Sequence, residues 1–118
     1  MAKLDFNKIN RPVLELTMED EAQTNITVET PSEGLVEELE AMIPELDTIF
    51  SPDNPKSVDA AYDLAARLMS CNQEGVTVTA DDLRTKYWRK NTIHNQLALM
   101  SFIGAYMDFL QEIKNAKN

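Results

Sequence analysis

Residues 93–114 read IHNQLALMSFIGAYMDFLQEIK and form the longest stretch of the chain with a helical pattern. Apolar side chains recur in it at intervals of three and four, which aligns them along a helix. They form two stripes. The first contains Ile93, Leu97, Met100, Ile103 or Gly104, Met107 and Leu110, and the second contains Leu99, Phe102, Tyr106, Phe109 and Ile113. A helix that is apolar on two faces is either central in its domain or shared with a partner.

These two stripes leave two interpretations open. In the first, the helix is the centre of a small bundle and both stripes are core. In the second, one stripe binds another copy or another protein, and the candidate protein interface is Leu99, Phe102, Tyr106, Phe109 and Ile113. A chain of 118 residues buries only about two thirds of its unfolded surface, and leftover apolar area on a terminal helix commonly serves oligomerisation. The second interpretation therefore includes a homo-oligomer as well as a complex with another protein.

The segment before this helix also has helical patterns. Residues 57–69 repeat apolar side chains at threes and fours, and Gly75 is suited to end that helix in a left-handed cap. An extended link over residues 76–78 follows, and Thr79 then caps a further helix that begins with acidic residues. Trp88 in this helix is either an aromatic anchor to the core or part of a recognition patch.

Residues 31–50 predict an acidic helix. Thr30 can cap it, and Pro31 suits the first helical position because the N–H that proline lacks has no intrahelical partner there. Glu33 completes a Thr-x-x-Glu capping box. Two prolines and several turn-forming residues at positions 51–56 then predict a loop that separates the acidic helix from the helices that follow.

The N-terminal part predicts an arm and a hairpin. Residues 1–10 alternate weakly and have no capping signal, so we expect an arm or an edge strand there. Residues 12–18 alternate apolar and polar side chains, and Ile26 and Val28 repeat this period of two after a polar turn at residues 19–23. A two-stranded hairpin is marginal in water, so its apolar face requires a third strand or a helix to cover it.

These segments predict one domain over residues 1–118. It consists of an arm and β-hairpin at residues 1–30, an acidic helix at residues 31–50 and a helical bundle at residues 57–118. The predicted fold class is α+β, mostly α, with the N-terminal hairpin followed by the small bundle. The length and the fraction of hydrophobic residues fit one ordinary hydrophobic core.

Charge is distributed unevenly along the chain. Residues 1–59 contain 14 Asp and Glu against 4 Lys and Arg, whereas residues 60–118 contain 6 against 7, and the net charge of the whole chain is −9. This field repels phosphates, and the basic residues form only one short cluster at positions 84–90, so we expect no nucleic-acid binding. The acidic half is either a solvated surface or a docking face for a basic partner.

Motifs for catalysis and metal binding are missing from the sequence. The chain has no phosphate-binding glycine loop, no Gly-x-Ser-x-Gly elbow and no Cys-x-x-Cys or His-x-x-x-His pair. His94 is the only histidine and Cys71 the only cysteine. A catalytic dyad of these two is one interpretation, and a packed cysteine with a histidine at a helix start is the favoured one. We therefore expect no enzyme activity, no cofactor and no metal site.

The sequence also bears on the cellular compartment. No window approaches the roughly 18 consecutive apolar residues of a membrane-spanning helix, so no membrane partner is expected. There is no basic, apolar leader at the N-terminus, and the single Cys71 can form no internal disulfide. These features predict a protein of the reducing cytoplasm.

Several segments taken together resemble a known protein family. They are AYDLAARLM at residues 61–69, the link GVTVT at residues 75–79 and the ending YMDFLQEIKN at residues 106–115, in a small acidic chain with an N-terminal strand pair. This pattern resembles the tail assembly chaperones of long-tailed bacteriophages and prophages of Gram-positive hosts. The resemblance covers mainly residues 57–118.

The resemblance implies a non-catalytic protein of the host cytoplasm that is absent from the mature virion. Such a protein binds the long tape measure protein and helps to recruit tail tube subunits. The residues are compatible with this role, because apolar stripes can bind amphipathic helices and a high net charge favours solubility. Two alternatives stay open: a structural virion component, such as a tail completion or head–tail connector protein, and a generic helical adaptor domain.

Overall fold

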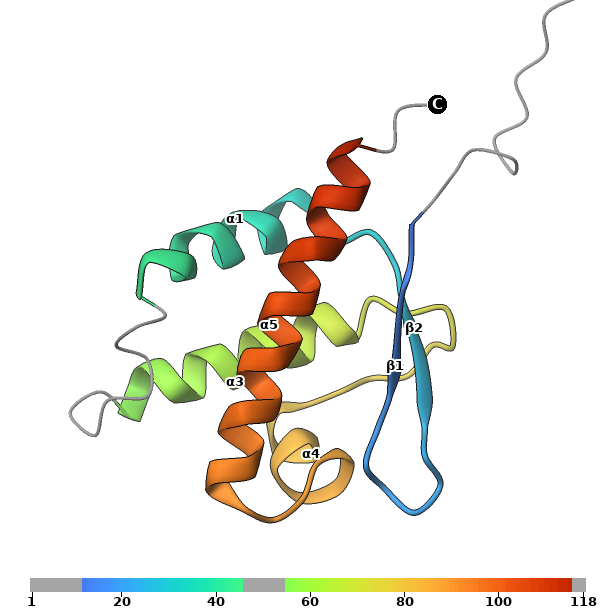
Figure 1. Ribbon diagram of the computed structural model, residues 1–118, viewed down its shortest axis with the longest axis vertical. Coiled ribbons are helices and arrows are strands. Elements are labelled where there is room, and N and C mark those ends of the chain that lie inside the picture. Colours follow the sequence, from blue (N-terminus) through green and yellow to red (C-terminus); the bar gives the residue numbers. More distant parts are fainter. Residues whose placement is uncertain (1–11, 46–54, 116–118) are drawn as a thin grey trace, which may run out of the picture.

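A computed structural model describes residues 12–45 and 55–115 of the chain. The expected arm at residues 1–10 and the last five residues of the predicted acidic helix, 46–50, lie outside these residues, as do positions 51–54 of the loop. The described part has a two-stranded antiparallel hairpin beside a group of helices (Figure 1). The fold class is α+β, mostly α, which confirms the prediction from the sequence.

The hairpin consists of β1 (Leu14–Thr17) and β2 (Asn25–Val28). Its register follows the alternation in the sequence, because Leu16 lies opposite Ile26 and the apolar side chains of both strands therefore share one face. Ile26 and Val28 are buried on that face, and Leu16 is half-buried. The helices supply the cover that an isolated hairpin needs.

The helices that build the core are α1 (Glu33–Met42), α3 (Pro55–Met69) and α5 (Thr92–Asn115). A single 3-10 turn, η2 (Ile43–Glu45), extends α1. Helices α1 and α3 pack against each other, and α5 crosses α3 (Figure 1). Because α3 contacts α1, α5 and β2, it is the element around which the others are arranged.

From Ala61 onward, most side chains of α3 are buried. Those inside the core are Ala61, Tyr62, Leu64, Ala65, Ala66, Leu68 and Met69. The alanines among them have short side chains, which lets neighbouring helices approach α3 closely. Among the described residues, no helix is both long enough and apolar enough to cross a lipid bilayer.

The start of α1 differs from the prediction. The helix begins at Glu33, because Ser32 rather than Thr30 is the N-cap. The hydroxyl of Ser32 accepts a hydrogen bond from the N–H of Leu35 at 3.3 Å, which satisfies one of the free donors of the first turn. Pro31 is buried and precedes the helix instead of forming its first position.

The end of α3 also differs. The helix stops at Met69, and Gly75 lies in the turn that follows, where its φ of +71° is the left-handed conformation that glycine favours. The side chain of Asn72 ends the helix early by providing competing hydrogen bonds. Its Nδ2 donates to the carbonyl oxygens of Met69 and Val76 at 2.8 and 2.7 Å, and the N–H of Val76 donates to its Oδ1 at 2.9 Å.

The cap predicted at Thr79 is present. Its hydroxyl accepts from the N–H of Asp82 at 3.1 Å, and its own N–H donates to the Asp82 carboxylate at 3.2 Å, which is a complete capping box. The short α4 (Ala80–Asp82) then continues into a π-helical segment, η3 (Leu83–Tyr87). Trp88 is buried, which supports the interpretation of this residue as an anchor to the core.

Candidate functional site

The stripe predicted as a protein interface lies in the core. Leu99, Phe102, Tyr106 and Phe109 are at most 5% exposed, and Ile113 is half-buried. The rings form a row, with centroids 5.5 Å apart between Phe102 and Tyr106 and 5.4 Å apart between Tyr106 and Phe109. Of the two interpretations of this stripe, the structure therefore supports the first, in which Leu99, Phe102, Tyr106 and Phe109 are core residues that other elements of the domain cover, and not an exposed docking surface.

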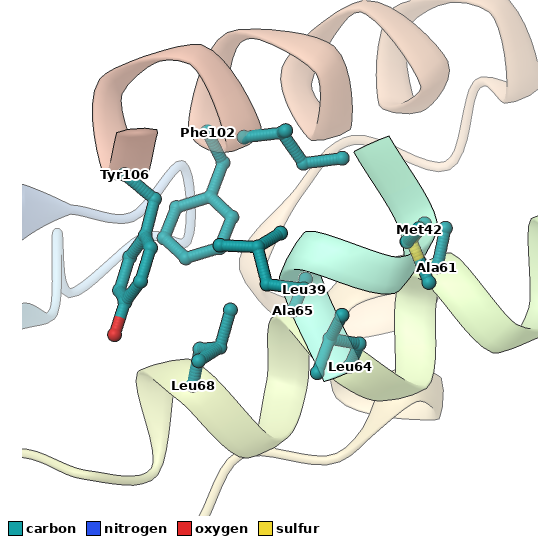
Figure 2. A pocket seen from close by; sticks show the side chains of 9 residues that line it. Leu39, Met42, Ala61, Leu64, Ala65, Leu68, Phe102 and Tyr106 are labelled. Atoms are coloured by element: carbon teal, nitrogen blue, oxygen red, sulfur yellow. The ribbon is translucent and has the colours of Figure 1, made fainter. Parts of the chain in front are cut away.

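Figure 2 shows what covers the middle of this stripe. Phe102 and Tyr106 point from α5 toward Leu39 of α1 and Leu68 of α3. The space between these helices is too small for a water molecule to enter. The hydroxyl of Tyr106 has no hydrogen-bond partner among the described residues, and burial raises the pKa of this side chain. This region is packed core and not a ligand cavity.

The other stripe supplies the exposed apolar surface of α5. Ile93, Leu97 and Met100 are 73%, 59% and 53% exposed, and Val13 is the remaining large apolar side chain that is exposed among the described residues. Positions 93, 97 and 100 follow the i, i+4, i+7 spacing of a single helix face. We call these three residues the exposed stripe. Gly104 continues the same face and is also exposed.

Only part of the first stripe predicted from the sequence is exposed. Ile103 and Leu110 are buried and Met107 is half-buried, so they belong to the border of the core. The helix turns every 3.6 residues, and a stripe that is followed in steps of three therefore drifts around its axis. Of the two residues proposed at the fourth position, Gly104 is the exposed one.

Glu19 fixes the start of α5 against the hairpin. Its carboxylate lies 3.1 Å from Nε of Arg89 and 2.6 Å from Nε2 of His94. Its backbone N–H donates to the carbonyl oxygen of Tyr87 at 2.7 Å. The hairpin turn that follows β1 therefore positions the segment at which the exposed stripe begins.

The structure does not bring Cys71 and His94 together as a catalytic pair. The thiol of Cys71 donates to the carbonyl oxygen of Arg67 at 3.7 Å, whereas His94 contacts Glu19. Among residues 12–45 and 55–115, no group of three or more His, Cys, Asp and Glu side chains is placed to hold a metal ion.

A pocket that the sequence did not indicate lies beside the first turns of α5. Its volume is about 380 Å³. The lining comes from α3, η3, the segment before α5 and α5 itself, and consists of Val58, Tyr62, Arg84, Thr85, Lys90, Asn91, Thr92, Asn95 and Gln96. Because these residues come from four separate parts of the chain, no local pattern could have predicted the pocket. We call it the Asn95 pocket.

No protein-family model, curated protein or solved structure matches this chain. The two candidate surfaces, the exposed stripe and the Asn95 pocket, are therefore interpreted from their own chemistry.

Proposed function

We propose that this chain is a non-catalytic assembly factor of the phage tail assembly chaperone type. In this role it binds the tape measure protein in the host cytoplasm and helps to recruit tail tube subunits. The resemblance of residues 57–118 to that family motivates the proposal, and the exposed stripe is the observation that carries it.

The exposed stripe has the form of a helix-binding surface. Three large apolar side chains on one helix face can pack between the side chains of an amphipathic partner helix. Full burial of one such side chain contributes about 1.5–3 kcal/mol before the costs of association are subtracted. Three of them support a reversible interaction, which suits a chaperone that must leave its partner.

The charge of the chain supports the same role. A net charge of −9 opposes aggregation, and the exposed Glu33, Glu37, Glu38 and Glu40 concentrate negative charge on α1. A partner coated by such chains acquires a repulsive surface while its own apolar face is covered. The negative charge of this chain therefore keeps the complex soluble, while its exposed stripe supplies the apolar contact.

The test is co-expression with the longest coiled-coil-like protein encoded beside this chain. We expect the wild-type chain to raise the soluble fraction of that partner and to co-purify with it. Leu97→Asp should abolish both effects, because it places a carboxylate in the middle of the exposed stripe. Ala60→Asp is the matched control, since it adds the same charge at an exposed position of α3.

Two outcomes would contradict the proposal. One is a folded wild-type chain that neither binds nor solubilises the partner. The other is the presence of this chain in purified particles at a fixed copy number, which a tail completion or connector protein would show and a chaperone would not.

A further inference from the structure

The Asn95 pocket combines positive charge with an apolar wall. Arg84 and Lys90 supply the charge, Val58 and Tyr62 supply the wall, and no acidic residue lines the pocket. The guanidinium of Arg84 is held in place, because it donates to the carboxylate of Asp59 and lies 4.2 Å from the centroid of the Tyr62 ring. The pocket therefore contains a fixed guanidinium whose charge is partly balanced by Asp59.

Lys90 is the freer of the two cations. It is exposed and forms no ion pair with any residue that the structure describes. In a chain of net charge −9, the uncompensated charge of Lys90 makes this pocket a favourable place for an anion, whereas the charge of Arg84 is partly balanced by Asp59.

Asn95 carries an unused hydrogen-bonding group. The residue is only 3% exposed, and its Oδ1 has no hydrogen-bond partner among the described residues. Buried amides are nearly always paired, so an unpaired one calls for an explanation. As placed, the oxygen is buried, so a ligand in the pocket that Asn95 lines reaches it only after the side-chain amide rotates toward the pocket. A ligand with its own N–H donor would satisfy the oxygen.

The pocket lining can therefore accommodate three groups close together: an anion beside Lys90, an N–H donor for Asn95, and an apolar group against the wall. The last residue of a polypeptide has all three, since its α-carboxylate, backbone N–H and side chain share one Cα. Inorganic anions have only the charge. We propose that the Asn95 pocket binds the carboxyl terminus of a partner polypeptide that ends in an apolar residue.

This inference is independent of the proposed function. Gln96 lines the pocket and Leu97 belongs to the exposed stripe, so the two surfaces are adjacent on α5, but they use different side chains. A small probe tests the pocket alone, without any partner protein.

The experiment is an NMR titration of the full ¹⁵N-labelled chain with N-acetyl-leucine, which contains the carboxylate, the N–H and the apolar side chain. For a probe of this size we expect a Kd in the millimolar range. The shift changes should centre on the Asn95 side-chain amide and the backbone amides of residues 90–96. N-acetyl-leucinamide, which lacks the charge, and acetate, which lacks the other two groups, should each bind at least tenfold more weakly.

Two variants test the assigned groups. Lys90→Gln should weaken binding of N-acetyl-leucine about fivefold or more, whereas Lys86→Gln, an exposed lysine outside the pocket lining, should leave it unchanged. Asn95→Leu should also weaken binding about fivefold or more. The same variant should raise Tm, because it removes a buried acceptor that has no partner.

Three results would overturn the inference. They are binding of N-acetyl-leucine no tighter than that of its amide or of acetate, wild-type affinity in Lys90→Gln, and wild-type affinity in an Asn95→Leu protein that stays folded. None of them would affect the co-expression result, so failure of this site and failure of the proposed function can be told apart.

Discussion

The two faces of α5 have similar side chains and opposite surroundings. Leu99 on one face is 0% exposed, whereas Leu97, the same residue type two positions earlier, is 59% exposed. The buried face lies against the other core elements, α3 among them. On the opposite face, nothing in the described part of the chain covers the exposed stripe.

Apolar side chains therefore have different effects on the two faces of α5. On the buried face, apolar side chains stabilise the domain because other elements take them out of water. On the exposed face, three large apolar side chains in a line give no such stabilisation, and they raise the tendency to aggregate. An apolar line of this kind is typical of a surface that is covered by a partner.

The largest effect expected from this comparison is at Leu99. Leu99→Asp places a carboxylate where no water reaches, so we expect a loss of more than about 4 kcal/mol and an unfolded or molten protein. Leu97→Asp should change the free energy of unfolding by less than about 0.5 kcal/mol. Urea unfolding followed by far-UV circular dichroism measures both. If Leu97→Asp also unfolded the chain, the exposed stripe would be part of a structural interface.

A smaller effect of opposite sign is expected on the buried face at Tyr106. Its hydroxyl is buried without a partner in the described structure, so Tyr106→Phe should raise the stability by about 1 kcal/mol, or a few degrees in Tm. Tyr87→Phe is the control, because its hydroxyl is not among the buried atoms without a partner. A destabilised Tyr106→Phe protein would mean that the hydroxyl has a partner in solution.

The same substitution has a consequence for pH. Burial raises the pKa of Tyr106 above its ordinary value of 10.0, so the folded state prefers the neutral phenol. That contribution to stability is complete below pH 10.0 and is lost as pH rises through the folded pKa. Tyr106→Phe should therefore lose less stability than the wild-type chain when unfolding is measured above pH 10.0.

The hairpin and the long helix could be predicted because their patterns are local. What the sequence did not reveal was which face of α5 the other helices cover, since that depends on α1 and α3. A signal was nevertheless present. Ser101, Asp108 and Gln111 fall on the same face as Leu97 and are exposed, whereas no polar residue interrupts the row from Leu99 to Phe109 along the buried stripe. The polar residues within an apolar stripe therefore indicate which face of α5 is exposed better than the apolar spacing does.

The N-cap of α1 shows a second limit of local patterns. Thr30 and Ser32 are both good capping residues, and the capping box with Glu33 favoured Thr30. The structure uses Ser32, so the path of the chain between hairpin and helix decides between two locally acceptable starts.

A test of this start also tests how firmly α1 is held over the buried face of α5. Ser32→Ala should cost about 0.5–1 kcal/mol, because the N–H of Leu35 loses its capping acceptor at an exposed helix end. Thr30→Ala should cost less, since Thr30 is exposed and lies before the cap. Equal losses in urea unfolding would indicate that both residues cap the helix in solution.

The smallest effect is expected at the ion pair that joins α1 to α3. Arg67 donates to both carboxylate oxygens of Glu38, at 2.7 and 2.9 Å, and these hydrogen bonds hold the pKa of Glu38 below its ordinary value of 4.5. Both side chains are about half exposed, so solvent screens most of the attraction. Glu38→Gln should lower the urea midpoint slightly at neutral pH, whereas Glu37→Gln, exposed on the same helix and without an ion pair among the described residues, should not.

The sign of the pH dependence makes this small effect measurable. Because the pKa of Glu38 is lower in the folded than in the unfolded chain, the ion pair stabilises the fold above pH 4.5, and that stabilisation is lost as pH falls through the folded pKa. The difference between wild-type and Glu38→Gln proteins should therefore shrink in strong acid. A difference that persisted there would mean that the neutral carboxyl of Glu38 and the amide of Gln form different hydrogen bonds with Arg67, because the two side chains have nearly the same shape.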